Sequence, residues 1–227
     1  MKKLILPSLL AITICFSSCN SEKKTENGEE NGNETTVSSE NGKGKYQIKS
    51  GNFTTKAQTQ MMGSGMDTYT ITYFDDYGAK ELTESVTKMD MGGMKMETHT
   101  YSLVKDQTMY SWEQGKTTGT KYNFSDMMKN MNYETFSEEM KKQYNYKELG
   151  TETVLGKTCK KISVEIQKGS SATVCTWKGI SMRSEVNVAG MPMTMEVTEL
   201  NENASTDASK FEIPSDVTFT EMKMPGQ

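Results

Sequence analysis

Histidine is almost absent from this chain: the single one is His99. The sequence also contains no HExxH motif, no glycine-rich phosphate-binding loop and no recognisable Ser-His-Asp set. A lone histidine in a strand-like segment is more often a structural or surface residue than a general base. We therefore expect a protein that is not an enzyme and that carries no cofactor.

Basic clusters and long apolar runs are scarce too. The formal charge is −4, and it becomes −6 if Lys2 and Lys3, the two lysines of the first 18 residues, are removed with a signal. An acidic chain without a basic cluster argues against nucleic acid as a partner. After the run from Leu4 to Phe16, no stretch is long and apolar enough to span a bilayer.

The chain begins like a secreted protein. A basic head, the short apolar run and Ser17-Ser18 before Cys19 are typical of a secretory signal over residues 1–18. The cysteine at the cleavage point makes this signal resemble that of bacterial lipoproteins, which implies that Cys19 is lipidated. The resemblance predicts an outer-membrane lipoprotein of the cell envelope, on its periplasmic or its surface side. The alternative is an ordinary secretory signal.

Residues 19–45 are predicted to be a disordered polar tether. From Asn20 to Lys45, Val37 is the only aliphatic residue and there is no aromatic one. Such a segment buries too little apolar surface to offset the entropy of ordering it. The remaining residues, 46–227, are a suitable length for one domain, which we expect to be monomeric.

Leucine is rare in that domain, whereas methionine is abundant. After the signal there are five leucines but eighteen methionines. Methionine is flexible and polarizable, so it fills irregular apolar interiors or lines adaptable binding sites. We expect most of the eighteen to replace leucine in the core.

The segment from Ile180 to Glu199 has the clearest pattern in the chain. Apolar residues alternate with polar ones on both sides of Ala189-Gly190, which predicts a hairpin that turns there. Val188 then faces Met191, and Arg183 faces Glu196 on the other side. The apolar face supplies most of the predicted ligand-lining residues, which are Met182, Val186, Val188, Met191, Met193 and Met195.

A second hairpin is predicted from Phe53 to Asp75, with its turn at Gly63-Ser64-Gly65 and Met62 facing Met66. In this register Phe53 and Ala57 share a face with three apolar residues of the second strand. These three complete the predicted ligand-lining set, and they are Tyr69, Ile71 and Tyr73.

A third hairpin is predicted from Glu81 to Val104, with a turn at Gly92-Gly93. Its apolar residues change faces along its length: the tip methionines share one face, whereas Leu82 and Leu103 lie on the other. Either a bulge switches the faces, or the tip extends beyond the core with its methionines in the open. The tip also suggests an alternative function, binding of a soft ion such as Cu(I) or Ag(I) by Met89, Met91, Met94 and Met96.

The rest of the domain reads as mainly β with a helical insertion. Residues from Ser125 to Tyr144 have helical spacing, which predicts one or two short helices over a sheet. We expect nine to eleven antiparallel strands in all. Cys159 and Cys175 lie across a predicted hairpin in an oxidising compartment, so they form either a disulfide or a pair of small buried thiols.

The order of these segments resembles the LolA/LolB-like lipoprotein-carrier domains, and especially uncharacterised bacterial lipoproteins thought to share that fold. The segments that carry the resemblance are Tyr73-Phe74-Asp75-Asp76-Tyr77-Gly78, Gly156-Lys157-Thr158-Cys159-Lys160, Trp177-Lys178-Gly179-Ile180 and Phe211-Glu212-Ile213-Pro214. It implies a strongly curved antiparallel sheet, an unclosed β-barrel whose concave apolar face is covered by helices.

The function that this resemblance implies is binding of a hydrophobic, lipid-like ligand, because carriers of this kind hold acyl chains against the concave face. An apolar segment of a partner protein is the other occupant we expect. Besides soft-metal binding, a structural or surface-interaction module with a filled core is a further alternative.

Overall fold

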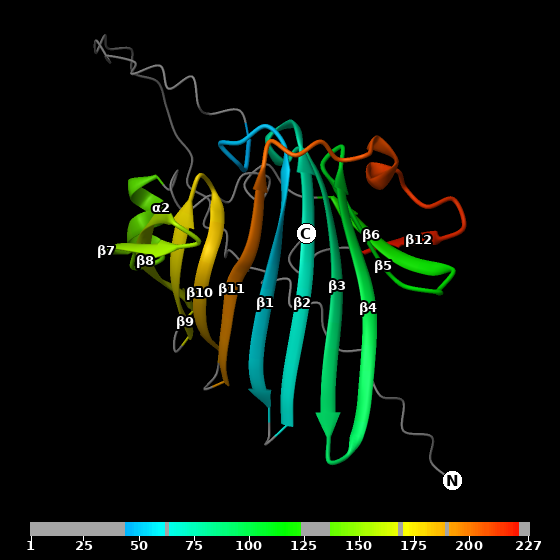
Figure 1. Cartoon of the computed structure of the whole chain (residues 1–227), viewed down its shortest axis with the longest axis horizontal. Helices are drawn as coiled ribbons and strands as arrows, with labels where there is room; N and C mark the ends of the chain where they lie inside the picture. The colour runs from blue at the N-terminus through cyan, green and yellow to red at the C-terminus, as the bar shows by residue number, and fades with distance from the viewer. Residues whose placement is uncertain (1–43, 62–63, 124–136, 168–169, 189–190, 223–227) are drawn as a thin grey trace, which may run out of the picture. The chain divides into compact units, whose positions relative to one another are not determined.

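The computed structural model describes residues 44–61, 64–123, 137–167, 170–188 and 191–222, which belong to one compact unit. Their strands form one curved sheet of twelve, in the order β12-β6-β5-β4-β3-β2-β1-β11-β10-β9-β8-β7 (Figure 1). The first and last strands of this order, β12 and β7, are not paired with each other, so the sheet does not close into a barrel. The predicted curved, unclosed and mainly β fold is confirmed.

Two runs of neighbouring strands make up this sheet. The first consists of β1 (Gly51–Met61), β2 (Ser64–Asp75), β3 (Lys80–Met91), β4 (Met94–Lys105), β5 (Thr108–Glu113) and β6 (Thr118–Asn123), with the short turn η1 (Asp76–Gly78). The second consists of α2 (Glu138–Gln143), β7 (Lys147–Val154), β8 (Lys157–Gln167), β9 (Ser170–Trp177), β10 (Ile180–Val188) and β11 (Met191–Glu202), followed by η3 (Ala208–Phe211) and β12 (Thr218–Glu221).

Two long-range pairings join these runs. Strand β1, which begins the first run, pairs antiparallel with β11 of the second run at the centre of the sheet. The final strand β12 returns to the far edge and pairs parallel with β6. The sheet is therefore larger than the nine to eleven strands expected, and it is not purely antiparallel.

Three apolar clusters stabilise the sheet. The first contains Phe53, Phe74, Met182 and Val197, with Tyr46 packed against them and its hydroxyl donating to Glu81 at 2.6 Å. The second lies where α2 meets the sheet and comprises Ile162, Val164, Ala172, Val174 and Val186. The third comprises Leu82, Leu103 and Phe211, the last from η3.

The β10–β11 hairpin has the register predicted from its alternation. Val188 pairs with Met191, Val186 with Met193 and Arg183 with Glu196. Two residues separate Val188 from Met191 in the sequence, so this pairing follows directly from the alternation on either side of them.

The β1–β2 hairpin corrects a prediction. Met61 pairs with Ser64 and Thr59 with Met66, so two residues, not three, separate the paired strands. Relative to the expected register the partners move by an odd number of positions, and an odd shift turns every side chain of one strand to the other face. Tyr69, Ile71 and Tyr73 therefore lie on the face opposite Phe53 and Ala57.

The β3–β4 hairpin resolves the two alternatives for its tip. Its pairing continues without a shift from Glu81–Val104 to Met91–Met94, so no bulge switches the faces. Instead the tip methionines are exposed, with 66% of Met94 and 44% of Met96 accessible to solvent.

The helical insertion is represented by α2, which begins after Ser137, whose side-chain oxygen accepts from the Met140 amide at the helix N-cap. The first part of the predicted helical segment, residues 124–136, lies outside the described residues. Cys159 and Cys175 form a disulfide with Cα atoms 5.4 Å apart. Among the described residues, no helix has the length and apolar character needed to cross a membrane.

Candidate binding face of the sheet

The two faces of the sheet differ in chemistry and are named here by what packs on them. Met140 of α2 and Tyr144, which follows it, pack on the cluster that contains Val186. We call the face of the sheet that carries Val186 the α2 face. Phe211 of η3 packs on Leu82 and Leu103, whose face we call the η3 face. Strand pairing assigns every residue of β1 to β6 to one face or the other, because directly paired residues share a face.

Hydroxyl side chains dominate the middle of the α2 face. Thr68 and Thr87 are hydrogen-bonded across β2 and β3 at 3.1 Å, and Thr70 and Ser85 at 2.9 Å. None of these side chains is fully exposed, and Thr72 is buried. The hydroxyl rows comprise Thr55, Thr68, Thr70, Thr72, Thr83, Ser85, Thr87, Thr98, Thr100, Ser102, Ser111 and Thr120.

Methionines occupy the same face at one end of the strands. The hairpin ends of β1–β2, β3–β4 and β10–β11 all lie at the lower end of the sheet in Figure 1. There Met66 pairs with Met89 and Met89 with Met96, while Met193 pairs with Thr59, which itself pairs with Met66. We call this set the methionine band, and it comprises Met66, Met89, Met94, Met96, Met191 and Met193.

The predicted ligand-lining residues are divided between several places. Met182 and Val186 lie on the α2 side but are buried in the apolar clusters, so they are core residues in this structure. Met193 and Met195 are half-buried and Met191 is exposed. For Val188 the structure gives only the backbone pairing with Met191.

The other three members of that set do not lie with them. Tyr69, Ile71 and Tyr73 belong to the η3 face, where Lys56 lies over the Tyr69 ring at 5.6 Å and Lys210 over the Tyr73 ring at 4.1 Å. They cannot line a site on the α2 face together with the methionines.

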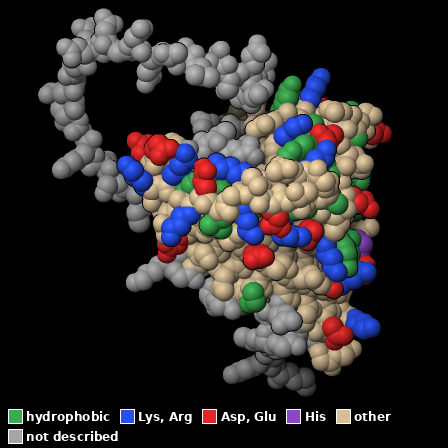
Figure 2. All heavy atoms as spheres, turned by 60° about the vertical axis from the view of Figure 1, so that its left-hand side comes forward, with side chains coloured by type: hydrophobic (Ala, Val, Ile, Leu, Met, Phe, Trp, Pro, Cys, Tyr) green, Lys and Arg blue, Asp and Glu red, His purple; other side chains and the backbone are tan. Residues whose placement is uncertain are grey.

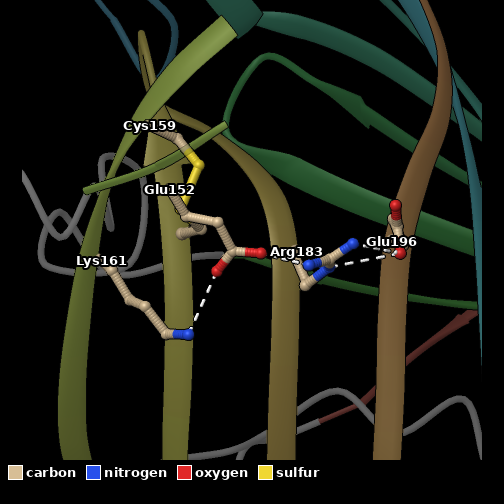
Figure 3. Close-up of a disulfide and its surroundings, with 6 residues drawn as sticks. Glu152, Cys159, Lys161, Arg183 and Glu196 are labelled. Atoms are coloured by element: carbon tan, nitrogen blue, oxygen red, sulfur yellow. Dashed lines mark hydrogen bonds and ion pairs between the residues drawn. A yellow bond between two sulfur atoms is a disulfide. The ribbon is translucent and has the colours of Figure 1, made fainter. Parts of the chain in front are cut away.

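Next to the disulfide, ion pairs link charged side chains of β7, β8, β10 and β11 (Figure 3). Glu152 of β7 forms ion pairs with Lys161 at 3.1 Å and with Arg183 of β10, although β8 and β9 lie between those two strands. Arg183 also binds Glu196 at 2.9 Å. The hydrogen bond from Lys161, with the charge of Arg183, holds the pKa of Glu152 below its ordinary value.

His99 also lies on the η3 face, since it pairs with Val86. Its Nε2 is 2.8 Å from Glu97, and this contact is the main cause that lowers the pKa of Glu97. Among the described residues, no three His, Cys, Asp or Glu side chains are placed to share a metal ion. On the side seen in Figure 2, acidic and basic side chains are interspersed.

A hollow of about 470 Å³ opens near the ends of β8, β9 and β10. Its lining is mainly polar and includes Asn145, Lys147, Glu165 and Ser171. A smaller hollow of about 100 Å³ lies beside Tyr110 and Tyr122. Both hollows are lined mainly by polar residues, so neither is an apolar cavity suited to acyl chains. The candidate binding surface is the α2 face, where the methionine band lies next to the hydroxyl rows.

Strand alternation alone identified most of the methionine band but missed Met66 and the full extent of the hydroxyl rows. Met66 was placed incorrectly because the β1–β2 turn was assigned one residue too many. With two residues between the paired strands, Met66 shares a face with Phe53 and Ala57, whereas its pairing with Met89 depends on the connection between β2 and β3.

Comparison with known proteins gives no family and no curated protein that matches the chain. An uncharacterised conserved protein from Thermus thermophilus is similar at 8% identity with a TM-score of 0.44, covering 75% of this chain and 90% of that one. A chain of the MucA/MucB complex from Pseudomonas aeruginosa gives 12% identity and a TM-score of 0.42, covering 74% of this chain and 57% of that one.

A β-barrel-like protein of unknown function from Brucella abortus is also similar, at 9% identity and a TM-score of 0.37, with coverage of 69% and 99%. At these scores the likenesses carry no argument about family or activity. The resemblance to LolA/LolB-like carriers stays a prediction.

Proposed function

We propose that this chain is a membrane-tethered, non-enzymatic binding protein of the cell envelope, and that its α2 face holds a lipid-like ligand. The observation that carries the proposal is the division of that face into hydroxyl rows and a methionine band. An amphiphile lying along the strands would place its apolar chain on the methionines and its polar group beside the hydroxyls.

The chemistry of the two zones supports this arrangement. Methionine side chains adapt their shape to an irregular apolar ligand. Ser and Thr hydroxyls both donate and accept hydrogen bonds, so they suit a polar head group without requiring a charge. The predicted lipid anchor on Cys19 and the polar tether would keep this face near a membrane surface, where such ligands occur.

Photolabelling tests the proposal with the whole membrane-anchored chain. Palmitic acid carrying a diazirine is added and activated by light, and the labelled peptides are identified by mass spectrometry. We expect labelling on peptides that contain Met89 and Met96. The double substitution Met89→Thr with Met96→Thr removes apolar contact area, so we expect labelling to fall about tenfold, equivalent to about 1.4 kcal/mol.

A matched control comes from the same hairpin. Val86→Thr with Tyr101→Thr changes apolar residues of β3 and β4 on the η3 face, and we expect it to leave labelling unchanged. Equal labelling of both faces, or equal loss in both double variants, would contradict a specific site on the α2 face. Cross-linking to a protein in place of the fatty acid would indicate a partner segment as the occupant and overturn the lipid proposal.

A further inference from the structure

The methionine band contains a group of three thioethers in one line across three adjacent strands. Met66 of β2 pairs directly with Met89 of β3, which pairs directly with Met96 of β4. Adjacent strands are about 4.8 Å apart, and each methionine has three rotatable side-chain bonds. The sulfur atoms of all three residues can therefore reach a common point above β3.

Among the described residues, the strand neighbours of these three on the α2 face carry no charge. Thr68, Thr87 and Thr98 form the next row along the strands. The charged residues of the tip lie on the η3 face, where Lys88 and Glu97 form an ion pair at 3.5 Å. Hard cations such as Ca²⁺ and Mg²⁺ bind through oxygen ligands, whereas a thioether set suits a soft monovalent ion.

Core packing does not account for this placement. Met182 illustrates a methionine used as core filler, since none of it is exposed. In contrast, Met96 is 44% exposed and Met94, on the same face two residues away, is 66% exposed. The hairpin that presents them is held by a tight turn, in which the Asp90 carboxylate accepts a hydrogen bond from the Gly93 amide at 3.0 Å.

We propose that Met66, Met89 and Met96 bind one soft monovalent metal ion, Cu(I) or Ag(I), through their thioether sulfurs. The site is formed by residues from two hairpins and therefore requires the folded sheet. It lies at the hairpin end of the α2 face, where Met66 and Met89 are half-buried and Met96 is 44% exposed. This binding is independent of the proposed lipid function, since it uses sulfur chemistry and not apolar area.

Metal titration of the whole chain in detergent tests the site. Cu(I) affinity is measured anaerobically by competition with a chromogenic Cu(I) chelator, and the stoichiometry of Ag(I) is measured by native mass spectrometry. We expect one ion per chain. The triple variant Met66→Leu, Met89→Leu and Met96→Leu keeps the apolar volume but removes the sulfurs, so we expect affinity to fall about a hundredfold or more.

Met193→Leu is the matched control, because Met193 belongs to the same band but Thr59 separates it from Met66. We expect its Cu(I) affinity to equal that of the unmodified chain. Unchanged affinity in the triple variant, or a loss in Met193→Leu as large as in the triple variant, would overturn the assignment. Binding of Zn²⁺ as tight as that of Cu(I) would overturn the soft-ion chemistry.

The same triple variant separates this inference from the lipid proposal. Leucine preserves the apolar surface, so fatty-acid labelling should persist in the variant while Cu(I) binding is lost. If the unmodified chain binds Cu(I) but is not labelled by the fatty acid, the lipid proposal is rejected and the metal site is supported. The reverse result rejects the metal site and keeps the lipid proposal.

Discussion

Methionine occupies three environments in this protein, and each gives the side chain a different role. Met182 is fully buried and packs with Phe53 and Val197. Met193 is half-buried against the cluster near α2. Met96 is 44% exposed near a hairpin tip. The row of the sheet in which a methionine lies therefore decides whether it fills the core or remains accessible to solvent.

Glu152 is one of the carboxylates through which the stability of the fold should depend on pH. Its pKa is held below the ordinary value of 4.5 by the hydrogen bond from Lys161 and by the charge of Arg183. A carboxylate with a lowered pKa in the folded state stabilises the protein above its unfolded pKa, and this contribution is lost as pH falls through the folded pKa. We predict that Glu152→Gln lowers the melting temperature at pH 7 and that the difference from the unmodified chain shrinks below about pH 4.5.

Thermal melts from pH 7 to pH 3 measure this effect. Glu185→Gln is the control, since Glu185 is exposed on the same strand as Arg183, two residues further along. We expect its profile to follow that of the unmodified chain. A difference for Glu152→Gln that stays constant or grows on acidification would show that the ion pairs do not stabilise the fold.

At the scale of single elements, the close approach of two neighbouring strands leaves no room for a side chain at Gly51. Gly51 begins β1 between Phe74 and Glu202, its partners on the neighbouring strands. A Cβ atom added there would lie 2.6 Å from the Asn201 carbonyl oxygen and 2.9 Å from the Phe74 ring. Because the nearest atom belongs to the backbone, rotation of a side chain cannot relieve the clash.

We therefore predict that Gly51→Ala destabilises the protein by about 1–3 kcal/mol, as overpacking does. Gly65→Ala is the matched control in the next strand, because an added Cβ there meets nothing within 4 Å. We expect that variant to be neutral or slightly stabilised. Urea unfolding measures both, and equal midpoints for the two variants would contradict the close contact at Gly51.

Turn length decides how well an element is predicted. Alternation and a two-residue turn gave the correct register for β10 and β11. The same procedure failed for β1 and β2, where a glycine on either side of Ser64 made the turn look longer than it is. Side chains alternate with a period of two, so this error placed Tyr69, Ile71 and Tyr73 on the wrong face.

At the scale of the whole molecule, the described strands form two runs that pair with each other at two places: β1 pairs with β11, and at the far edge β12 pairs with β6. Val197 lies in the first of these seams, paired with Thr55 and fully buried. The two tryptophans lie in different runs, Trp112 in β5 and Trp177 in β9. Their fluorescence therefore reports on two different parts of the sheet.

We predict that Val197→Ala destabilises both runs together by about 2 kcal/mol, through lost burial and a cavity at the seam. The measurement is fluorescence-detected urea unfolding of chains that keep one tryptophan, made with Trp112→Phe or Trp177→Phe. We expect Val197→Ala to lower both midpoints equally. A midpoint that falls for Trp177 but not for Trp112 would mean that the two runs unfold independently.

Local sequence determined much of this protein by itself. Alternating apolar residues and short turns were enough to predict strands, hairpins and a mainly β domain, because these depend on neighbours within a few residues. The same signals showed that methionine, not leucine, would supply much of the apolar surface. They also predicted that Cys159 and Cys175 lie on neighbouring strands, where a disulfide can form.

Only the tertiary structure decided which hairpins lie side by side. The pairing of β1 with β11, the return of β12 to β6 and the single row formed by Met66, Met89 and Met96 all join or align separate hairpins. Backbone hydrogen bonds between strands are nearly the same for any sequence, so local pattern carries little information about distant partners. The candidate binding face exists because closing those long-range contacts places the hairpin tips at one end of the sheet.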